Sequence, residues 1–288
     1  MPYYIALHPE GTTALWLVEE GARVVRRADG AQEQVDVPRG VDPLAAVTAS
    51  RKIWSFHLLD LAPGEYYPRI ARPNGQHPSQ SPGSNPVNHQ ERSLIETGRG
   101  QLMALRYQLE SVFRVIHPVE TNFSAFGHEI RNILILAATE VEAHWKGILN
   151  AHGARGSSTH DYVKLAQALK LREYAIRIPF YPWLEPIRPF EGWVLSETPT
   201  KNLSWYDAYQ AVKHDRENQF ERATLLNSLK AVCGCAVMLF AQFGTSGFHY
   251  RNEINSFFDV EEAPAWHPSE TYSLAQEGMP LKAVRYPF

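Results

Sequence analysis

NLSWYDAYQAVKHDRENQFERATLLNSLKAVCGCAVMLFAQF, residues 202–243, is the stretch on which the fold of the whole chain depends. Apolar residues recur three or four positions apart over residues 225–243, which predicts a helix with one broad buried stripe. No Pro or Gly interrupts residues 202–233, so we expect one long helix, or two nearly collinear ones, from Ser204 onward. Ser204 is the expected N-cap, with Asp207 in the position of a capping box.

The second half of this stretch is almost wholly apolar over residues 231–243. A membrane span needs roughly 20 such residues, so a buried core helix is the better interpretation. Cys233 and Cys235 point to nearly opposite sides of that helix and cannot bridge each other, which fits packing in a reducing compartment. The N-terminus has no positively charged segment followed by an apolar run, so we expect a cytoplasmic protein.

The first half of the stretch carries an aromatic face followed by an unbroken polar run at residues 213–219, KHDRENQ. Such a run is typical of a solvated helix face. It is also compatible with a functional cluster, because aromatic residues precede it by one turn and a histidine stands between two cations. Both interpretations remain open from the residues alone.

The segment YQAVKHDR, from Tyr209 to Arg216, resembles the HEPN superfamily (higher eukaryotes and prokaryotes nucleotide-binding). That family has an all-α, often dimeric fold, and many members are metal-independent ribonucleases of defence and toxin–antitoxin systems. Its signature is an Arg, often followed by Asn, with a His four to six residues after the Arg. His214 matches the His, whereas Tyr209 occupies the Arg position and Gln210 the Asn position. The resemblance covers residues 93–244.

The resemblance implies that a neutral histidine takes the proton of a ribose 2′-hydroxyl while a nearby cation stabilises the phosphate. It implies no metal or other cofactor. The implied catalytic residues are His214, Arg216 and Lys213, and the implied substrate-binding residues are Tyr209, Gln210, Asp207 and Asn218. Because Tyr209 replaces the usual Arg, Lys213 or Arg216 would have to supply the cation.

Three functions therefore stay open. The first is a HEPN-like protein that binds RNA or nucleotide in bacterial stress or phage defence. The second is an active metal-independent endoribonuclease that uses His214 with Lys213 or Arg216. The third is a structural or protein-interaction module. The resemblance also implies a homodimer, and a small N-terminal domain is a candidate site for a protein partner.

Length and charge limit these choices. At 288 residues and 32.7 kDa the chain can hold one large domain or two. A net charge of −3 and a pI near 6.5 give no overall basic field, so any RNA contact must be a local patch. The 12 histidines form neither an HExxH motif nor a Cys/His zinc pattern.

The remaining chain predicts a mainly α fold after a β-rich start. Residues 1–70 alternate like a strand meander and predict a small β-rich or α+β domain. Residues 71–92 are rich in Pro, Ser and Asn and predict a linker. A HEPN-like helical domain is expected over 93–244, and an irregular extension over 245–288.

Within the helical domain, helical spacing predicts helices over residues 93–117, from about residue 122 to 149, and over residues 161–177. Closely spaced prolines over residues 179–199 predict an ordered, non-helical segment that covers the helices or walls one side of a pocket. The hexapeptide RGSSTH, residues 155–160, also has the Arg and His spacing of the family. We interpret that match as coincidence, because no long apolar helix follows it.

Overall fold

The structure, a computed structural model, describes residues 2–19, 24–28, 31, 33–74, 89–248, 253–273 and 281–288. The chain divides into two compact units that each draw on separate stretches. The first unit comprises Met1–Tyr67, Arg72–Pro86 and Ala265–Val284, and the second comprises Pro68–Ala71, Val87–Pro264 and Arg285–Phe288. Most of the linker expected at residues 71–92 lies outside the described residues.

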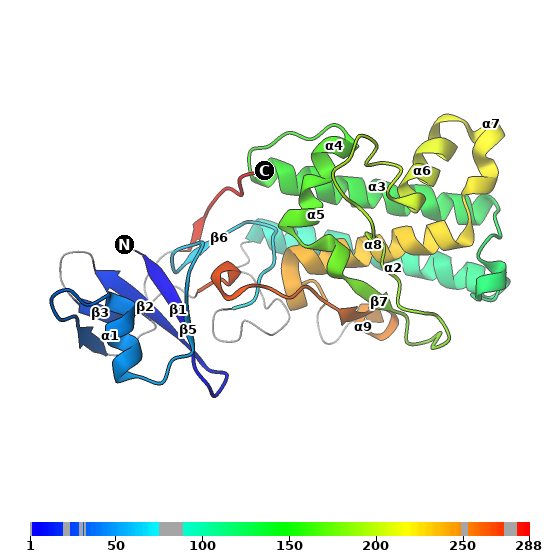
Figure 1. The fold of residues 1–288 in the computed structure, drawn as a ribbon. Coiled ribbons are helices and arrows are strands. Elements are labelled where there is room, and N and C mark those ends of the chain that lie inside the picture. Colours follow the sequence, from blue (N-terminus) through cyan, green and yellow to red (C-terminus); the bar gives the residue numbers. More distant parts are fainter. Residues whose placement is uncertain are drawn as a thin grey trace. The chain divides into compact units, whose positions relative to one another are not determined.

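The first unit is built on an antiparallel sheet of order β4-β3-β2-β1-β5 (Figure 1). Its strands are β1 (Tyr3–Leu7), β2 (Thr13–Glu19), β3 (Val24–Arg27), β4 (Gln34–Asp36) and β5 (Ser55–Leu58). The first hairpin turns at Gly11, whose φ of 78° is readily adopted by glycine. The strands expected in the first 70 residues are therefore confirmed.

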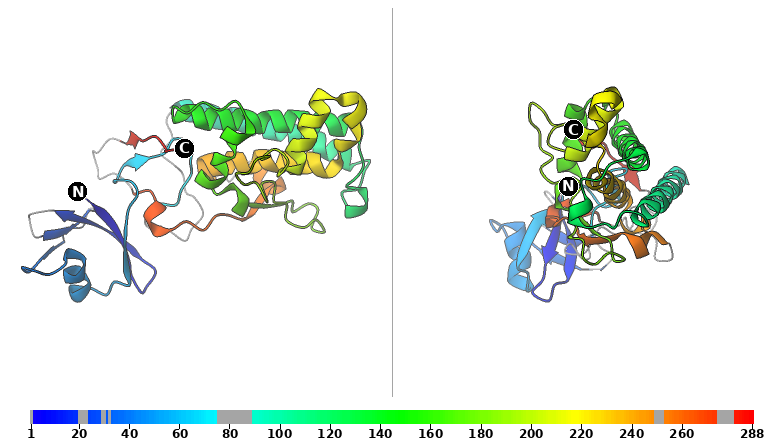
Figure 2. Two further views of the ribbon diagram at one scale, coloured as in Figure 1. Left: turned by 45° about the horizontal axis from the view of Figure 1, so that its top comes forward. Right: turned by 90° about the vertical axis from the view of Figure 1, so that its right-hand side faces the viewer.

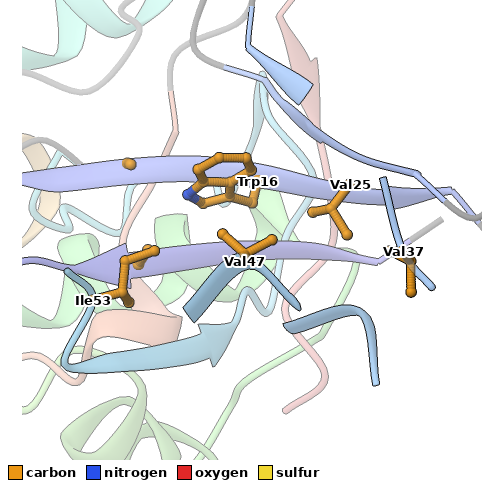
Figure 3. Close-up of a cluster of buried hydrophobic side chains, with 7 residues drawn as sticks. Trp16, Val25, Val37, Val47 and Ile53 are labelled. Carbon is orange, nitrogen blue, oxygen red and sulfur yellow. The ribbon is translucent and has the colours of Figure 1, made fainter. Parts of the chain in front are cut away.

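Alternating residues of β2 belong to two different apolar clusters, because successive side chains of a strand point to opposite faces of the sheet. Trp16 packs with Val25 and Val37 on one face, and Leu15 packs with Ile5 on the other. The sequence did not predict helix α1 (Pro43–Ser50). This helix adds Val47 to the Trp16 cluster, as Figure 3 shows. Asp42 caps this helix by accepting from the Ala45 N–H at 2.9 Å.

The first unit also takes up residues that the sequence assigned to an irregular extension. A parallel pair joins β6 (Glu65–Tyr66) to β9 (Lys282–Ala283), and the short η5 (Pro268–Glu270) contacts β1 and β5. The Arg72 guanidinium lies over the rings of Tyr67, Trp266 and Tyr272 at 4.9 to 5.8 Å, which favours its charge in a buried setting.

The second unit is a bundle of four long helices. Seen end-on in Figure 2, α8 lies among the others, and it packs against all three of them. The four are α2 (His89–Phe113), α3 (His128–Ala151), α6 (Ser204–His214) and α8 (Leu225–Phe243). Nearly every residue of α8 from Leu229 onward is buried, which confirms the expected core helix. α8, extended to Ser246, is the one described helix long and apolar enough to cross a membrane, and 83% of its most apolar 18-residue stretch is buried within the fold.

The sequence suggested one long helix, or two nearly collinear ones, over residues 202–243. The structure contradicts this expectation. These residues form a helical hairpin in which α6 and α8 pack side by side. The connection is α7 (Arg216–Gln219) and η3 (Phe220–Arg222). The break needs neither Pro nor Gly, because two side chains cap new helices: Asp215 accepts from the Asn218 N–H, and Thr224 accepts from the Asn227 N–H, each at 3.3 Å.

The expected start of α6 also differs. Leu203 is the N-cap residue and Ser204 is the first helical residue, without a side-chain cap. Asp207 makes an ion pair with Arg222 across the hairpin instead of completing a capping box. A carboxylate in the first turn still stabilises the positive end of the helix dipole.

The helix expected over residues 161–177 is broken into short elements. They are α4 (Thr159–Tyr162), α5 (Lys164–Ala168), η2 (Leu171–Glu173) and β7 (Ala175–Arg177). Lys170 has a φ of 51°, a left-handed conformation that ends the helix. β7 pairs with β8 (Asp259–Glu262), which follows α9 (Glu253–Phe257). The proline-rich segment at 179–199 is ordered and non-helical, as expected.

Candidate functional site

A polar pocket of about 600 Å³ lies in the second unit, where α3, α4 and α6 meet. This size falls in the range of small-molecule sites, roughly 300–1,000 Å³. We call it the lysine pocket. It is lined by Glu142, Lys146, Ser157, Ser158, Thr159, His160, Tyr162, Thr200, Tyr206, Gln210 and Lys213.

The helices place its polar groups by simple spacing. Glu142 and Lys146 are four residues apart on α3 and share a face. Tyr206, Gln210 and Lys213 follow at intervals of four and three on α6, so they line one face of that helix. Because α3 and α6 pack against each other, these two polar faces meet in the pocket.

Aromatic residues form a rigid support behind the lining. The ring of Trp145, fully buried on α3, lies 4.7 Å from Trp193, 5.3 Å from Tyr162 and 5.2 Å from Tyr206, measured between centroids. Aromatic pairs at these distances stabilise a single arrangement. Two rings of this cluster, Tyr162 and Tyr206, also line the pocket, so the core and the lysine pocket share a wall.

Glu142 is the one acidic residue among the lining residues that the structure describes. Its Oε1 accepts from the Tyr206 hydroxyl at 2.6 Å and from the Gln210 amide at 3.3 Å. Gln210 also donates to the Tyr206 hydroxyl oxygen at 3.0 Å. Burial, followed by the hydrogen bond to Glu142, raises the pKa of Tyr206, so this hydroxyl stays protonated as the donor.

Two lysines give the pocket a positive balance. Lys146 Nζ lies 3.6 Å from Glu142 Oε2, with half of its side chain exposed. Lys213 Nζ donates to the Tyr209 hydroxyl at 3.0 Å and lies 5.0 Å from the centroid of that ring. The hydrogen bond to Tyr209 raises the pKa of Lys213, so its ammonium charge is favoured. Two ammonium groups against one carboxylate select an anionic ligand.

The opposite wall supplies hydroxyls and one histidine. Ser158 caps α4 in a capping box with Asp161, and hydrogen bonds from Ser157 and Ser158 lower the pKa of Asp161. His160 Nε2 lies 3.2 Å from the carbonyl oxygen of Glu197. A carbonyl only accepts, so Nε2 carries the proton and Nδ1 of the neutral ring is an acceptor.

The structure brings three of the residues expected from the sequence to this site. Gln210 and Lys213 line the pocket, and Tyr209 lies under Lys213. The proline-rich segment contributes beside them, because the Glu197 carbonyl holds His160 and Thr200, directly after the segment, lines the pocket.

The other four expected site residues lie elsewhere. His214 is exposed at the end of α6, one residue and about 100° beyond Lys213, and it does not line the pocket. Arg216 and Asn218 are exposed on α7, where Asn218 bonds to Asp215. Asp207 pairs with Arg222.

Several lining residues were missed in the sequence. The sequence analysis assigns no role to Lys146, although its spacing to Glu142 is that of an ion pair. His160 was set aside with the RGSSTH match. The hydroxyl run SST, residues 157–159, is the sequence signal that could have indicated the site. Only the fold brings this run into one pocket with residues of α6.

Neither a metal nor a known relative helps to define the site. Within the described residues, no group of three or more His, Cys, Asp or Glu side chains is arranged to hold a metal ion. Comparisons with protein-family models, with curated proteins and with solved structures give no match for this chain. What the site does is therefore argued from its own residues.

Proposed function

We propose that this protein binds RNA or a nucleotide through the lysine pocket. The observation that carries the proposal is the pairing of Lys213 and Gln210, from the segment that resembles HEPN proteins, with Lys146 of α3 in one pocket. Ammonium groups and hydroxyls are the donors that bind phosphate and sugar oxygens.

The charge distribution supports a local site over an extended one. The chain has a net charge of −3, so it lacks the broad basic surface of proteins that follow a nucleic-acid backbone. A pocket of about 600 Å³ holds one nucleotide, not a strand. The ligand is thus a free nucleotide or a single nucleotide unit of an RNA. The HEPN-like fold, the homodimer and the defence setting remain proposals that the resemblance supplies.

The test is fluorescence anisotropy with a labelled short single-stranded RNA, and with a labelled mononucleotide, in EDTA. We expect saturable binding that weakens with added salt and that weakens further in Lys213→Ala and Lys146→Ala. Lys230→Ala, a change of equal charge on α8 outside the pocket, is the matched control. Equal weakening in all three variants, or no binding to either probe, contradicts the proposal.

A second candidate is the metal-independent endoribonuclease, and one observation favours it. The Glu197 carbonyl fixes the tautomer of His160 that leaves Nδ1 as an acceptor, which is the form a general base needs. Two lysines in the same pocket could stabilise the phosphate charge. The general base expected from the sequence is His214, which does not line the pocket.

Incubating a mixed RNA pool with the protein in EDTA separates the candidates. Cleavage that is lost in His160→Asn and retained in His214→Ala identifies a ribonuclease centred on the pocket. Cleavage lost in His214→Ala alone identifies the site expected from the sequence. Binding without cleavage in the wild-type protein supports the binding function.

A further inference from the structure

We propose, resting on the function above, that the lysine pocket selects guanine nucleotides, with Glu142 and Gln210 reading the edge of the base. The inference comes from the acceptor atoms of Glu142 and Gln210, which the binding of a phosphate does not use. A ligand that fills this pocket must satisfy both its cations and its acceptors, because polar groups left unpaired on binding cost affinity.

Glu142 is held in one orientation before any ligand arrives. Its side chain is only 12% exposed, and its Oε1 is anchored by Tyr206 and Gln210. Oε2 lies 3.6 Å from Lys146 Nζ, beyond hydrogen-bond distance, and an ion pair with so exposed a lysine is weak. Oε2 therefore keeps capacity to accept from a ligand in the pocket that Glu142 lines.

Gln210 supplies a second acceptor in the same pocket. Its amide nitrogen must face Glu142 and Tyr206, because a carboxylate oxygen can only accept. The amide oxygen of Gln210 therefore points away from these two partners and keeps its capacity to accept. Two acceptors in one pocket are satisfied by a ligand edge that carries two donors.

Guanine is the nucleobase that presents such an edge. Its N1–H and its 2-amino group are adjacent donors, whereas adenine and cytosine place a donor next to a ring nitrogen that accepts and would repel the carboxylate. The ligand class is thus a guanine nucleotide, or a guanosine unit of RNA, with its base at Glu142 and its phosphate at the lysines.

The test is isothermal titration calorimetry of the intact protein with GMP, IMP, AMP and inorganic phosphate. IMP differs from GMP only by lacking the 2-amino group. We expect GMP to bind about tenfold tighter than IMP, as one lost hydrogen bond to a charged group dictates, and AMP to bind more weakly still. In Glu142→Gln, the preference for GMP over IMP should fall severalfold, while phosphate binds as well as before or better.

Two further variants keep the test decisive. Tyr206→Phe removes the hydroxyl that anchors Glu142 and should lower the same preference, even if Glu142→Gln folds poorly. Glu129→Gln, at the exposed start of α3, should change nothing. Nucleotide binding without preference for GMP, or tighter binding of all four ligands by one factor in Glu142→Gln, overturns the guanine assignment alone. Absence of binding to every nucleotide overturns the proposed function with it.

Discussion

Lys213 is fixed in the pocket by Tyr209, which stands one helical turn earlier on α6. The phenol oxygen accepts from the ammonium group at 3.0 Å, and the ring face lies 5.0 Å from it. Tyr209 itself is buried, so it does not move with the exposed lysine. Tyr209 therefore positions a cation in the pocket.

The first prediction is that Lys213→Ala lowers nucleotide affinity about tenfold, because a charge-assisted hydrogen bond to phosphate is lost. Tyr209→Phe should lower it less, since the ammonium group stays but loses its fixed position. Calorimetric titration with a mononucleotide measures both. An unchanged affinity in Lys213→Ala, with Lys230→Ala as the reference, would place the ligand elsewhere.

At this scale the sequence could predict the part of the site that lies on one helix. Gln210, Lys213 and Tyr209 are neighbours in the chain, and their pattern pointed to them. His214 belongs to the same motif, yet the rotation of one residue along a helix turns it away. Glu142 and Lys146 could not be predicted, because only tertiary packing brings α3 to α6.

At the scale of elements, the hairpin of α6 and α8 depends on side-chain caps at its turn. Thr224 ends the connection, and its side chain satisfies one of the backbone N–H groups at the start of α8. The Leu225 N–H bonds to the carbonyl of Ala125 at 2.8 Å, which holds the start of α8 to the segment before α3. The cap and this backbone hydrogen bond therefore fix the point at which α8 begins.

The second prediction is that Thr224→Ala lowers the free energy of unfolding by about 1 kcal/mol, the usual cost of a lost N-cap. Thr139→Ala is the control, since Thr139 is within α3 and its exposed hydroxyl donates to the carbonyl one turn before it. Urea unfolding followed by circular dichroism compares them. Equal stability of Thr224→Ala and the wild type would show that the cap is not needed.

The third prediction concerns the close approach of Arg69 to α3. A Cβ added at Gly147 would lie 2.0 Å from Nη1 of Arg69, so the guanidinium would have to move. Arg69 Nε donates to Gln242 Oε1 at 2.8 Å in the interior. Gly147→Ala should therefore cost about 1–3 kcal/mol, despite the better helix propensity of alanine, because that buried hydrogen bond is disturbed.

Gly100→Ala is the matched control for this change, since no atom lies within 4 Å of a Cβ placed there on α2. Alanine at that position should be neutral or stabilising. The free energies of chemical unfolding of the two variants test this difference. A Gly147→Ala protein as stable as Gly100→Ala would mean that Arg69 relocates without loss.

The long elements were predictable from the sequence and the short ones were not. Apolar spacing located α2, α3 and α8, because each buries a stripe of side chains over several turns. It failed for residues 161–177, where Lys170 adopts a left-handed conformation that no pattern of apolar residues reveals. It also missed α1, whose eight residues bury only Val47.

At the scale of the whole molecule, the helical unit holds a histidine that must stay neutral. His144 lies between α3 and α8, where its Nδ1 is 3.1 Å from the Gln242 amide and its Nε2 is 3.4 Å from Glu140. Burial, together with the nearby charge of Arg69, lowers its pKa from 6.5 to about 3.

The fourth prediction follows from that lowered pKa. The unfolded chain takes up a proton at this histidine below pH 6.5, and the folded protein does not until about pH 3. The stability that neutral His144 contributes is therefore full above pH 6.5 and is lost as pH falls toward 3, at a rate of at most about 1.4 kcal/mol per pH unit.

Unfolding free energies measured across this range in the wild type and in His144→Leu isolate the contribution. The variant should show a shallower dependence on pH, whatever its stability at neutral pH. Parallel curves for the two proteins would show that His144 is not buried in its neutral form.

The central claim is that the ligand occupies the lysine pocket, and lysine footprinting tests its location directly. The intact protein is treated with an amine-modifying reagent with and without a guanine nucleotide, and the modified residues are identified by mass spectrometry. We predict that the nucleotide protects Lys146 and Lys213 and leaves Lys52 and Lys230 unchanged, since only the first two line the pocket. Protection at other lysines, or no protection at saturating nucleotide, would contradict the account.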